Sequence, residues 1–221
     1  MSKSAFWQAL IFTAIIFSLG VIAGFFLESR QSETIYSRLV NSELNIIDEQ
    51  LRQRIISDSN LSCSLSKESL FLFADKIYEE AMGLEEIDTT GRLGDLTILH
   101  RRYDLLRTLL LLEAESLKER CNGDFHIISY FYSYNLDDVE TSSKQNYFSK
   151  QTFDLKTAHP QDIILIPIAI DTNVASIDVF IKSRKITTYP VILIDNNKEI
   201  SEFVTLEELE KLVFNDTISS P

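Results

Sequence analysis

The sequence contains few of the residues from which metal centres and the commonest catalytic sites are built. Its 221 residues include only two cysteines, three histidines and one tryptophan. Cys63 and Cys121 belong neither to a C-x-x-C pair nor to a Cys/His cluster with metal-ligand spacing, which argues against a zinc site. The glycine-rich loops of nucleotide-binding proteins and the nucleophile elbow of hydrolases are also missing. We therefore expect no metal and no other cofactor.

Positive charge is also scarce. Lysine and arginine number 21 against 33 aspartates and glutamates, which gives a net charge of -12. Proteins bind nucleic acids through clustered lysines and arginines that neutralise phosphates, so we expect no nucleic-acid partner. The apolar fraction of 45% is sufficient for a buried core. A chain of this length suits one or two small domains.

Charged residues are absent from positions 5–27, which form the longest apolar run of the chain. About 20 apolar residues in a helix cross a hydrocarbon layer of roughly 30 Å, so this run predicts a transmembrane helix. A cleaved signal peptide is the alternative, because Val21-Ile-Ala23 is a permissible cleavage site. Its apolar core would span only about 7 to 15 residues, and the length of the run therefore favours an uncleaved anchor.

The residues that flank this run indicate its orientation. Lys3 precedes it, whereas Glu28 and Arg30 cancel each other directly after it. Positive charge favours the cytoplasmic side of a membrane. We therefore predict a cytoplasmic tail at 1–4 and a single-pass protein of the cell membrane whose remaining chain faces outward.

Two features of the first 60 residues are compatible with a homodimer. Gly20 and Gly24 match the small-xxx-small pattern that lets two helices approach closely in lipid, although such residues are common in membrane spans. Apolar residues then recur at steps of three and four between Ile35 and Ile55, as on an amphipathic helix. This stripe could form a coiled coil, or it could pack on the helices that follow, which is the interpretation we favour.

Residues 28–121 are predicted to form a helical segment ahead of the last domain. Apolar periodicity and capping residues indicate helices at 66–83 and 95–120. Their connection is short, so the two helices should form an antiparallel hairpin. The hairpin would place Cys63 beside Cys121. We predict a disulfide between them, with free thiols as the alternative.

From residue 122 the chain alternates between strand and helix patterns. The order β-α-β-α-β-β-α predicts an α/β fold with a mixed sheet and flanking helices over 122–214, followed by a tail at 215–221. The run at 163–170 is typical of a central strand covered on both faces, although Pro167 suggests a bulge or a local edge. The expected elements are strands 125–132, 163–170 and 191–195, helices 139–153 and 174–184, a turn at Asn196-Asn197, a further strand, and a final helix capped by Thr205.

Two short stretches lie at the ends of the predicted strands. The stretch Leu136-Asp137-Asp138-Val139 follows the first strand and begins a helix. Its aspartates could form a carboxylate pair for acid-base chemistry, but capping of the helix is the simpler interpretation. The dipeptide Tyr189-Pro190 directly precedes the strand at 191–195. Aromatic side chains that could line a groove near these stretches are Tyr130, Tyr132, Tyr134, Tyr147 and Phe148, although alternate ones on the strand must fill the core.

These two stretches and the element order resemble the thioredoxin-like superfamily, in particular membrane-anchored members with a helical segment ahead of the domain. In that family a C-x-x-C pair lies at a helix N-terminus, where backbone amides stabilise a thiolate. The resemblance implies that Leu136 and Val139 occupy the thiol positions and that Pro190 is a cis-proline beside them. Neither leucine nor valine can exchange disulfides, so we expect no oxidoreductase activity at this loop.

The resemblance thus implies a membrane-anchored, redox-inactive thioredoxin-like module outside the cytoplasm. Its backbone near Tyr189 and Pro190 would bind a protein or an extended peptide. Two alternatives stay open. One is a thiol-disulfide oxidoreductase that uses Cys63 and Cys121, and the other is a helical membrane scaffold on which the last domain is only a cap.

We expect protease added outside intact cells to digest residues 28–221 and to leave the anchor in the membrane, because 5–27 is the only long apolar run. Immunoblotting with antibodies against each end of the chain measures this. A cytoplasmic reporter protein in the same cells is the control for cell integrity. Protection of the C-terminal domain would contradict the predicted orientation.

Overall fold

The chain divides into two compact units, Met1–Asp58 and Ser59–Pro221, which are described separately. The structure is a computed structural model, and it describes residues 6–8, 10–24, 48, 51, 62–89, 97–136 and 138–214. The predicted division into a helical segment at 28–121 and a domain at 122–214 stays a prediction.

The first unit contains an apolar helix, Phe6–Gly24, that is long enough to cross a membrane. Its large apolar side chains are exposed, as a helix facing lipid requires. A Cβ added at Gly20 or Gly24 would meet no other atom of the chain. The same length and composition fit a signal sequence, so the uncleaved anchor, its orientation and the homodimer stay predictions. The amphipathic stripe at 35–55 lies outside the described residues except for positions 48 and 51.

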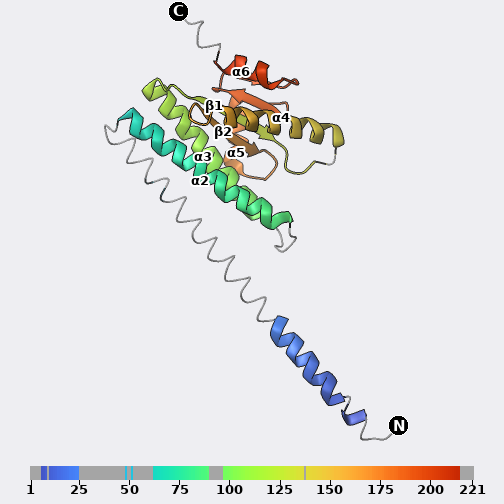
Figure 1. Cartoon of the computed structure of the whole chain (residues 1–221). Helices are drawn as coiled ribbons and strands as arrows, with labels where there is room; N and C mark the ends of the chain where they lie inside the picture. Colours follow the sequence, from blue (N-terminus) through green and yellow to red (C-terminus); the bar gives the residue numbers. More distant parts are fainter. Residues whose placement is uncertain are drawn as a thin grey trace, which may run out of the picture. The chain divides into compact units, whose positions relative to one another are not determined.

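The second unit is built around a four-stranded mixed sheet (Figure 1). In space the strands follow the order β2-β1-β3-β4, with β1 parallel to β2 and antiparallel to β3, and β3 antiparallel to β4. The predicted α/β fold with a mixed sheet and flanking helices is confirmed. The strands are β1 (His126–Tyr132), β2 (Ile163–Ala169), β3 (Val191–Ile194) and β4 (Lys198–Ile200).

The position of β2 differs from the prediction. The apolar run at 163–170 predicts a central strand, but β2 lies at one edge of the sheet and β1 holds the central place. The reason is that helices cover both faces of the edge strand, so Ile163, Ile164 and Ile166 are fully buried there. Pro167 fits this position, because the backbone N–H that it lacks is needed less on an edge strand.

Helices cover both faces of the sheet (Figure 1). On one face, α4 (Val139–Ala158) and α6 (Leu206–Phe214) pack on alternate residues of β1 and β3. On the other face, α3 (Thr97–Cys121) packs on β1 and β2, and the ring of Phe131 stacks on Phe180 of α5 (Ala175–Arg184) at 6.0 Å. An ion pair of 2.6 Å between Arg184 and Glu115 joins α5 to α3.

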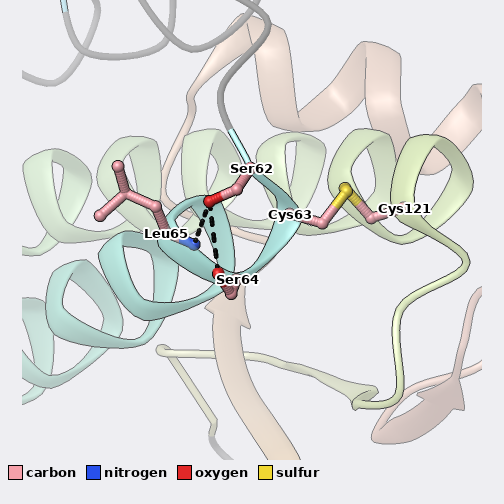
Figure 2. Close-up of a disulfide and its surroundings, with 5 residues drawn as sticks. All are labelled: Ser62, Cys63, Ser64, Leu65 and Cys121. Atoms are coloured by element: carbon pink, nitrogen blue, oxygen red, sulfur yellow. Dashed lines mark hydrogen bonds between the residues drawn. A yellow bond between two sulfur atoms is a disulfide. The ribbon is translucent and has the colours of Figure 1, made fainter.

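The helices α2 (Cys63–Thr89) and α3 pack against each other in opposite directions. At one end, the first residue of α2 and the last residue of α3 form the Cys63–Cys121 disulfide, with Cα atoms 5.7 Å apart (Figure 2). Further along, Arg102 of α3 pairs with Glu80 of α2 at 3.2 Å. The two cysteines therefore lie at the distance that the predicted disulfide requires.

Two boundaries of α2 differ from the predicted helix at 66–83. The helix begins at Cys63 because Ser62 caps it, and the hydroxyl of Ser62 accepts a hydrogen bond from the N–H of Leu65 at 3.4 Å (Figure 2). The helix also continues through Gly83 to Thr89. A glycine inside a helix costs only about 1 kcal/mol relative to alanine, which the adjoining turns can offset.

The turn between β3 and β4 is shifted by one residue from the predicted Asn196-Asn197. Its central residues are Asp195 and Asn196, with φ of 46° and 61°, and the N–H of Asn197 donates to the carbonyl of Ile194 at 3.0 Å. Positive φ at both central residues is typical of a type I′ hairpin turn. The carboxylate of Asp195 also accepts the N–H of Ile127 at 2.8 Å, which holds the turn against β1.

Replacing Cys63 and Cys121 together by serine should lower the free energy of unfolding by about 4 kcal/mol, because the bridge closes a loop of 58 residues in the unfolded chain. Urea unfolding of the full chain in detergent, followed by tryptophan-independent far-ultraviolet circular dichroism, measures the change. Ser64→Ala, beside Cys63, is the matched control and should change stability little. Free thiols in protein purified without reductant would contradict the bridge.

Candidate functional site

The loop that connects β1 to α4, residues 133–138, lies at the carboxyl end of the central strand. Leu136 is half-buried, whereas Val139 is 79% exposed at the first position of α4. Asp137 lies outside the described residues. Two of the four loop positions singled out from the sequence therefore present apolar side chains, and neither can act as a nucleophile.

Asp138 is the N-cap of α4. Its carboxylate accepts hydrogen bonds from the N–H of Thr141 at 2.8 Å and from the hydroxyl of Thr141 at 2.6 Å. These bonds lower the pKa of the Asp138 carboxyl, so the group stays ionised at neutral pH. Its oxygens are occupied in capping, which favours the structural interpretation of this aspartate over a catalytic one.

Asp171 fixes the first half of the loop. Because β1 and β2 are parallel, the segment after β2 begins at the same edge of the sheet as the loop after β1. From that segment, the carboxylate of Asp171 accepts the N–H of Tyr134 at 2.6 Å and the N–H of Asn135 at 2.8 Å. We call this pair of bonds the Asp171 clamp. Sequence reasoning missed it, although an aspartate directly after an apolar strand was its signal.

Gln145 of α4 fixes the start of the loop from the other side. Its side-chain amide donates to the carbonyl of Ser133 at 2.9 Å and accepts the N–H of Ser133 at 3.2 Å. The hydroxyl of Tyr130 in turn donates to the carbonyl of Gln145 at 2.7 Å. Burial raises the pKa of the Tyr130 hydroxyl, so it remains a donor at physiological pH.

Helix α3 reaches the same loop. The ring of His100 lies 4.3 Å from the ring of Tyr134, and the side-chain N–H of Arg101 donates to the carbonyl of Thr172 at 2.5 Å. The loop after β1 and the segment after β2 are thus both in contact with the first turns of α3. Tyr134 was expected at a groove, and the structure places it at the meeting point of these elements.

Asp104 is a carboxylate buried behind this meeting point, with only 1% of its surface exposed. Its Oδ1 accepts the N–H of Ala169, the last residue of β2, at 3.2 Å and lies 3.7 Å from the guanidinium of Arg107. Burial raises the pKa of Asp104 to about 6, against the opposing effects of these two partners. Sequence reasoning did not identify this residue, because the helix pattern gives no sign that one acidic position faces the sheet.

Tyr189 and Pro190 lie at the same end of the sheet. The Tyr189-Pro190 peptide bond is cis, and Pro190 is buried while Tyr189 is half-buried. Because Phe131 pairs with Val191, the antiparallel register continues from Tyr132 to Pro190. The topology therefore places Pro190 next to the strand end from which the loop 133–138 departs.

An exposed aromatic residue, Phe203, flanks this end of the sheet on the α4 side. It is 64% exposed, and its ring meets the edge of Tyr147 at 5.2 Å and of Phe148 at 6.2 Å. The ammonium of Lys144 lies over the Phe203 ring at 6.0 Å. Phe203 follows β4, whose end lies beside the start of β3. The groove expected from the sequence did not include Phe203, since a single phenylalanine in a polar loop gives no pattern.

The remaining aromatic residues divide between core and surface. Tyr130 and Phe148 are buried in the core on the α4 side, and Tyr132 and Tyr147 are half-buried beside them. The expectation that alternate strand residues fill the core is therefore correct for Tyr130. Only Tyr132, Tyr134 and Tyr147 keep surface that a ligand could reach.

The disulfide lies away from this site. Cys121 precedes β1 and the loop 133–138 follows it, and the seven residues of β1 span about 23 Å at 3.3 Å per residue. Among the described residues, no group of three or more His, Cys, Asp or Glu side chains could hold a metal ion. The arrangement at the carboxyl end of β1 offers apolar surface and backbone groups, which suits binding.

The chain was compared with known proteins. No protein-family model matches it, and no curated protein matches it.

Asp104→Asn should stabilise the protein at pH 7 and have little effect at pH 4. The folded-state pKa of about 6 exceeds the ordinary value of 3.8, so the protonated carboxyl stabilises the fold below pH 4 and this contribution is lost as the pH rises through 6. The shift corresponds to about 3 kcal/mol. Urea unfolding of both proteins from pH 4 to 7.5 measures it.

Asp138→Asn is the control of opposite sign for this titration. The pKa of Asp138 is lowered, so its carboxylate stabilises the fold above the unfolded pKa and this contribution disappears as the pH falls. A stability difference between wild type and Asp104→Asn that is constant from pH 4 to 7.5 would contradict the assignment of the titration to Asp104.

Proposed function

We propose that this protein is a membrane-anchored, redox-inactive module with a thioredoxin-like domain, and that it binds extended peptide segments of other proteins at the carboxyl end of β1. The observation that carries the proposal is the loop 133–138. It is held by the Asp171 clamp and by Gln145, carries no thiol, and presents exposed Val139 beside the strand end that faces Pro190.

The fold supports the thioredoxin-like part of this proposal. The resemblance implies the order β-α-β-α-β-β-α with helices on both faces of a mixed sheet, and the second unit has this order from β1 to α6. It also implies a proline directly before the third strand, where Pro190 lies. The α2 and α3 helices ahead of the domain correspond to the helical segment of the membrane-anchored members.

The chemistry of the surface indicates the kind of peptide that would fit. An extended peptide pairs with backbone groups and places alternate side chains on one face. At this site, those side chains would meet Val139 and Phe203, which are among the most exposed apolar residues of the second unit. The ammonium of Lys144 over the Phe203 ring would favour an acidic group next to the apolar ones.

Attachment to the membrane sets where the module would act. The helix Phe6–Gly24 would hold the domain at the outer surface of the cell membrane, in agreement with the orientation inferred from Lys3. The Cys63–Cys121 disulfide is compatible with that oxidising location. A homodimer through Gly20 and Gly24 would bring two such sites to one partner.

The two alternative functions make different demands on the molecule. A disulfide oxidoreductase would need an activated thiol at Cys63 or Cys121, and an insulin-reduction assay would detect it. A scaffold that acts only through its helices would keep its activity when the surface around Val139 and Phe203 is altered. The peptide-binding proposal requires the opposite result.

The test is a peptide-display screen against the full chain in lipid nanodiscs, with empty nanodiscs as background. We expect it to select extended peptides with alternating apolar residues and a nearby acidic residue. Val139→Asp and Phe203→Ser should each weaken the selected peptide about tenfold, since each removes an apolar contact or adds a desolvated charge. Fluorescence anisotropy of the labelled peptide measures the dissociation constant.

Val179→Asp is the matched control for Val139→Asp. Val179 is 67% exposed on α5, the helix on the opposite face of the sheet from α4. It should leave peptide affinity unchanged. Equal losses for Val139→Asp and Val179→Asp, or a screen that selects nothing above background, would reject the proposed site.

A further inference from the structure

We propose that Asp104 is a proton-binding positioning residue, which holds the loop 133–136 more firmly when it is protonated and so makes the order of this loop depend on pH. Its importance for ligand binding rests on the proposed function, but the effect on the loop does not. Three observations carry the inference: the short connection from Asp104 to the loop, two buried oxygen atoms without partners, and the charges around them.

The connection from Asp104 to the loop runs through three consecutive residues. Asp104 accepts the N–H of Ala169 at 3.2 Å. The next residue, Ile170, donates its N–H to the carbonyl of Tyr132 at 2.9 Å, and the one after it is Asp171, whose carboxylate holds the backbone of the loop. A shift of this strand end relative to α3 therefore moves the Asp171 clamp directly.

Two buried oxygens beside this connection have unsatisfied hydrogen-bonding capacity. The Oδ2 of Asp104 and the hydroxyl of Thr172 have no hydrogen-bond partner among the described residues. The two residues are 1% and 3% exposed, so water does not reach them freely. An unpaired polar atom in such a place costs about 1 to 3 kcal/mol. A proton on Oδ2 would supply a donor that the hydroxyl of Thr172 can accept.

The surrounding charges act in the same direction. The charged groups that face Asp104 are Arg107 on its own helix, 3.7 Å away, and Asp171 on the segment after β2. Arg101 already donates to the carbonyl of Thr172. The ionised Asp104 therefore repels the carboxylate of the Asp171 clamp, and protonation removes this repulsion. Burial raises the pKa of Asp104 to about 6, which places the change within the physiological range.

Linkage makes the effect reciprocal. If protonation of Asp104 favours the clamped loop, the clamped loop must favour protonation to the same extent. A ligand that needs the loop in its clamped form would then bind more tightly at pH 5 than at pH 7.5. A proton is the simplest effector that such a buried carboxyl can take up.

The test is amide hydrogen exchange of the full chain in detergent, measured by mass spectrometry from pH 5 to 7.5 without any peptide ligand. Rates are corrected for the intrinsic pH dependence of exchange. We expect the amides of Tyr134 and Asn135, which donate to Asp171, to be protected about threefold to tenfold more at pH 5 than at pH 7.5. In Asp104→Asn, which carries a neutral amide, protection should be high and independent of pH.

Glu115→Gln is the matched control. Glu115 is another carboxyl of α3 with a pKa raised by burial, but it pairs with Arg184 of α5 and does not contact the loop or the segment after β2. This variant should keep the pH dependence of the wild type. Protection of Tyr134 and Asn135 that does not change with pH in the wild type, or that changes equally in Asp104→Asn, would overturn the proposal. Neither outcome would bear on peptide binding itself.

Discussion

Burial of β1 on both of its faces is the constraint on which the second unit depends. Five consecutive residues of this strand, 127–131, are buried, so apolar surface must be supplied from two sides. One side comes from α4 and α6, which follow β1 in the sequence, and the other comes from α3 and α5. Because α3 precedes β1, the helices ahead of the α/β order are part of the core that covers the sheet.

This constraint also creates the candidate site. A central strand with a parallel neighbour on one side and an antiparallel one on the other brings three chain segments to its carboxyl end. These are the loop 133–138, the segment that holds Asp171, and the dipeptide Tyr189-Pro190. Their backbone groups cannot continue the sheet, so side chains such as those of Asp171 and Gln145 satisfy them instead. The loop is thereby rigid without any catalytic group.

The elements of the α/β part could be predicted from the sequence because each carries a local signal. Apolar runs bounded by polar segments mark β1, β2 and β3 within one residue of their observed ends, and Asp138 marks the start of α4. The errors lie where two local rules compete. Gly83 suggests a stop that neighbouring turns override, and the run 163–170 is as apolar as a central strand because helices cover the edge.

The site itself could be predicted only in part. Its loop and Pro190 follow from strand ends, but the Asp171 clamp joins residues more than 35 positions apart, and the contact of Asp104 with Ala169 joins residues 65 positions apart. Such bonds depend on how elements meet in space and have no periodicity in the sequence. Phe203 likewise gains its meaning only from Tyr147 and Lys144 beside it.

The disulfide has a mechanical consequence for a protein held at one end by a membrane and at the other by a partner. Tension transmitted along the chain from the anchor enters the second unit near Ser62 and reaches Cys63, which is bonded to Cys121. The load then passes through the sulfur atoms to the chain just ahead of β1, and the intervening residues of α2 and α3 bear none of it. A partner bound at the carboxyl end of β1 would thus pull against the central strand, while the two helices that cover it stay folded under load.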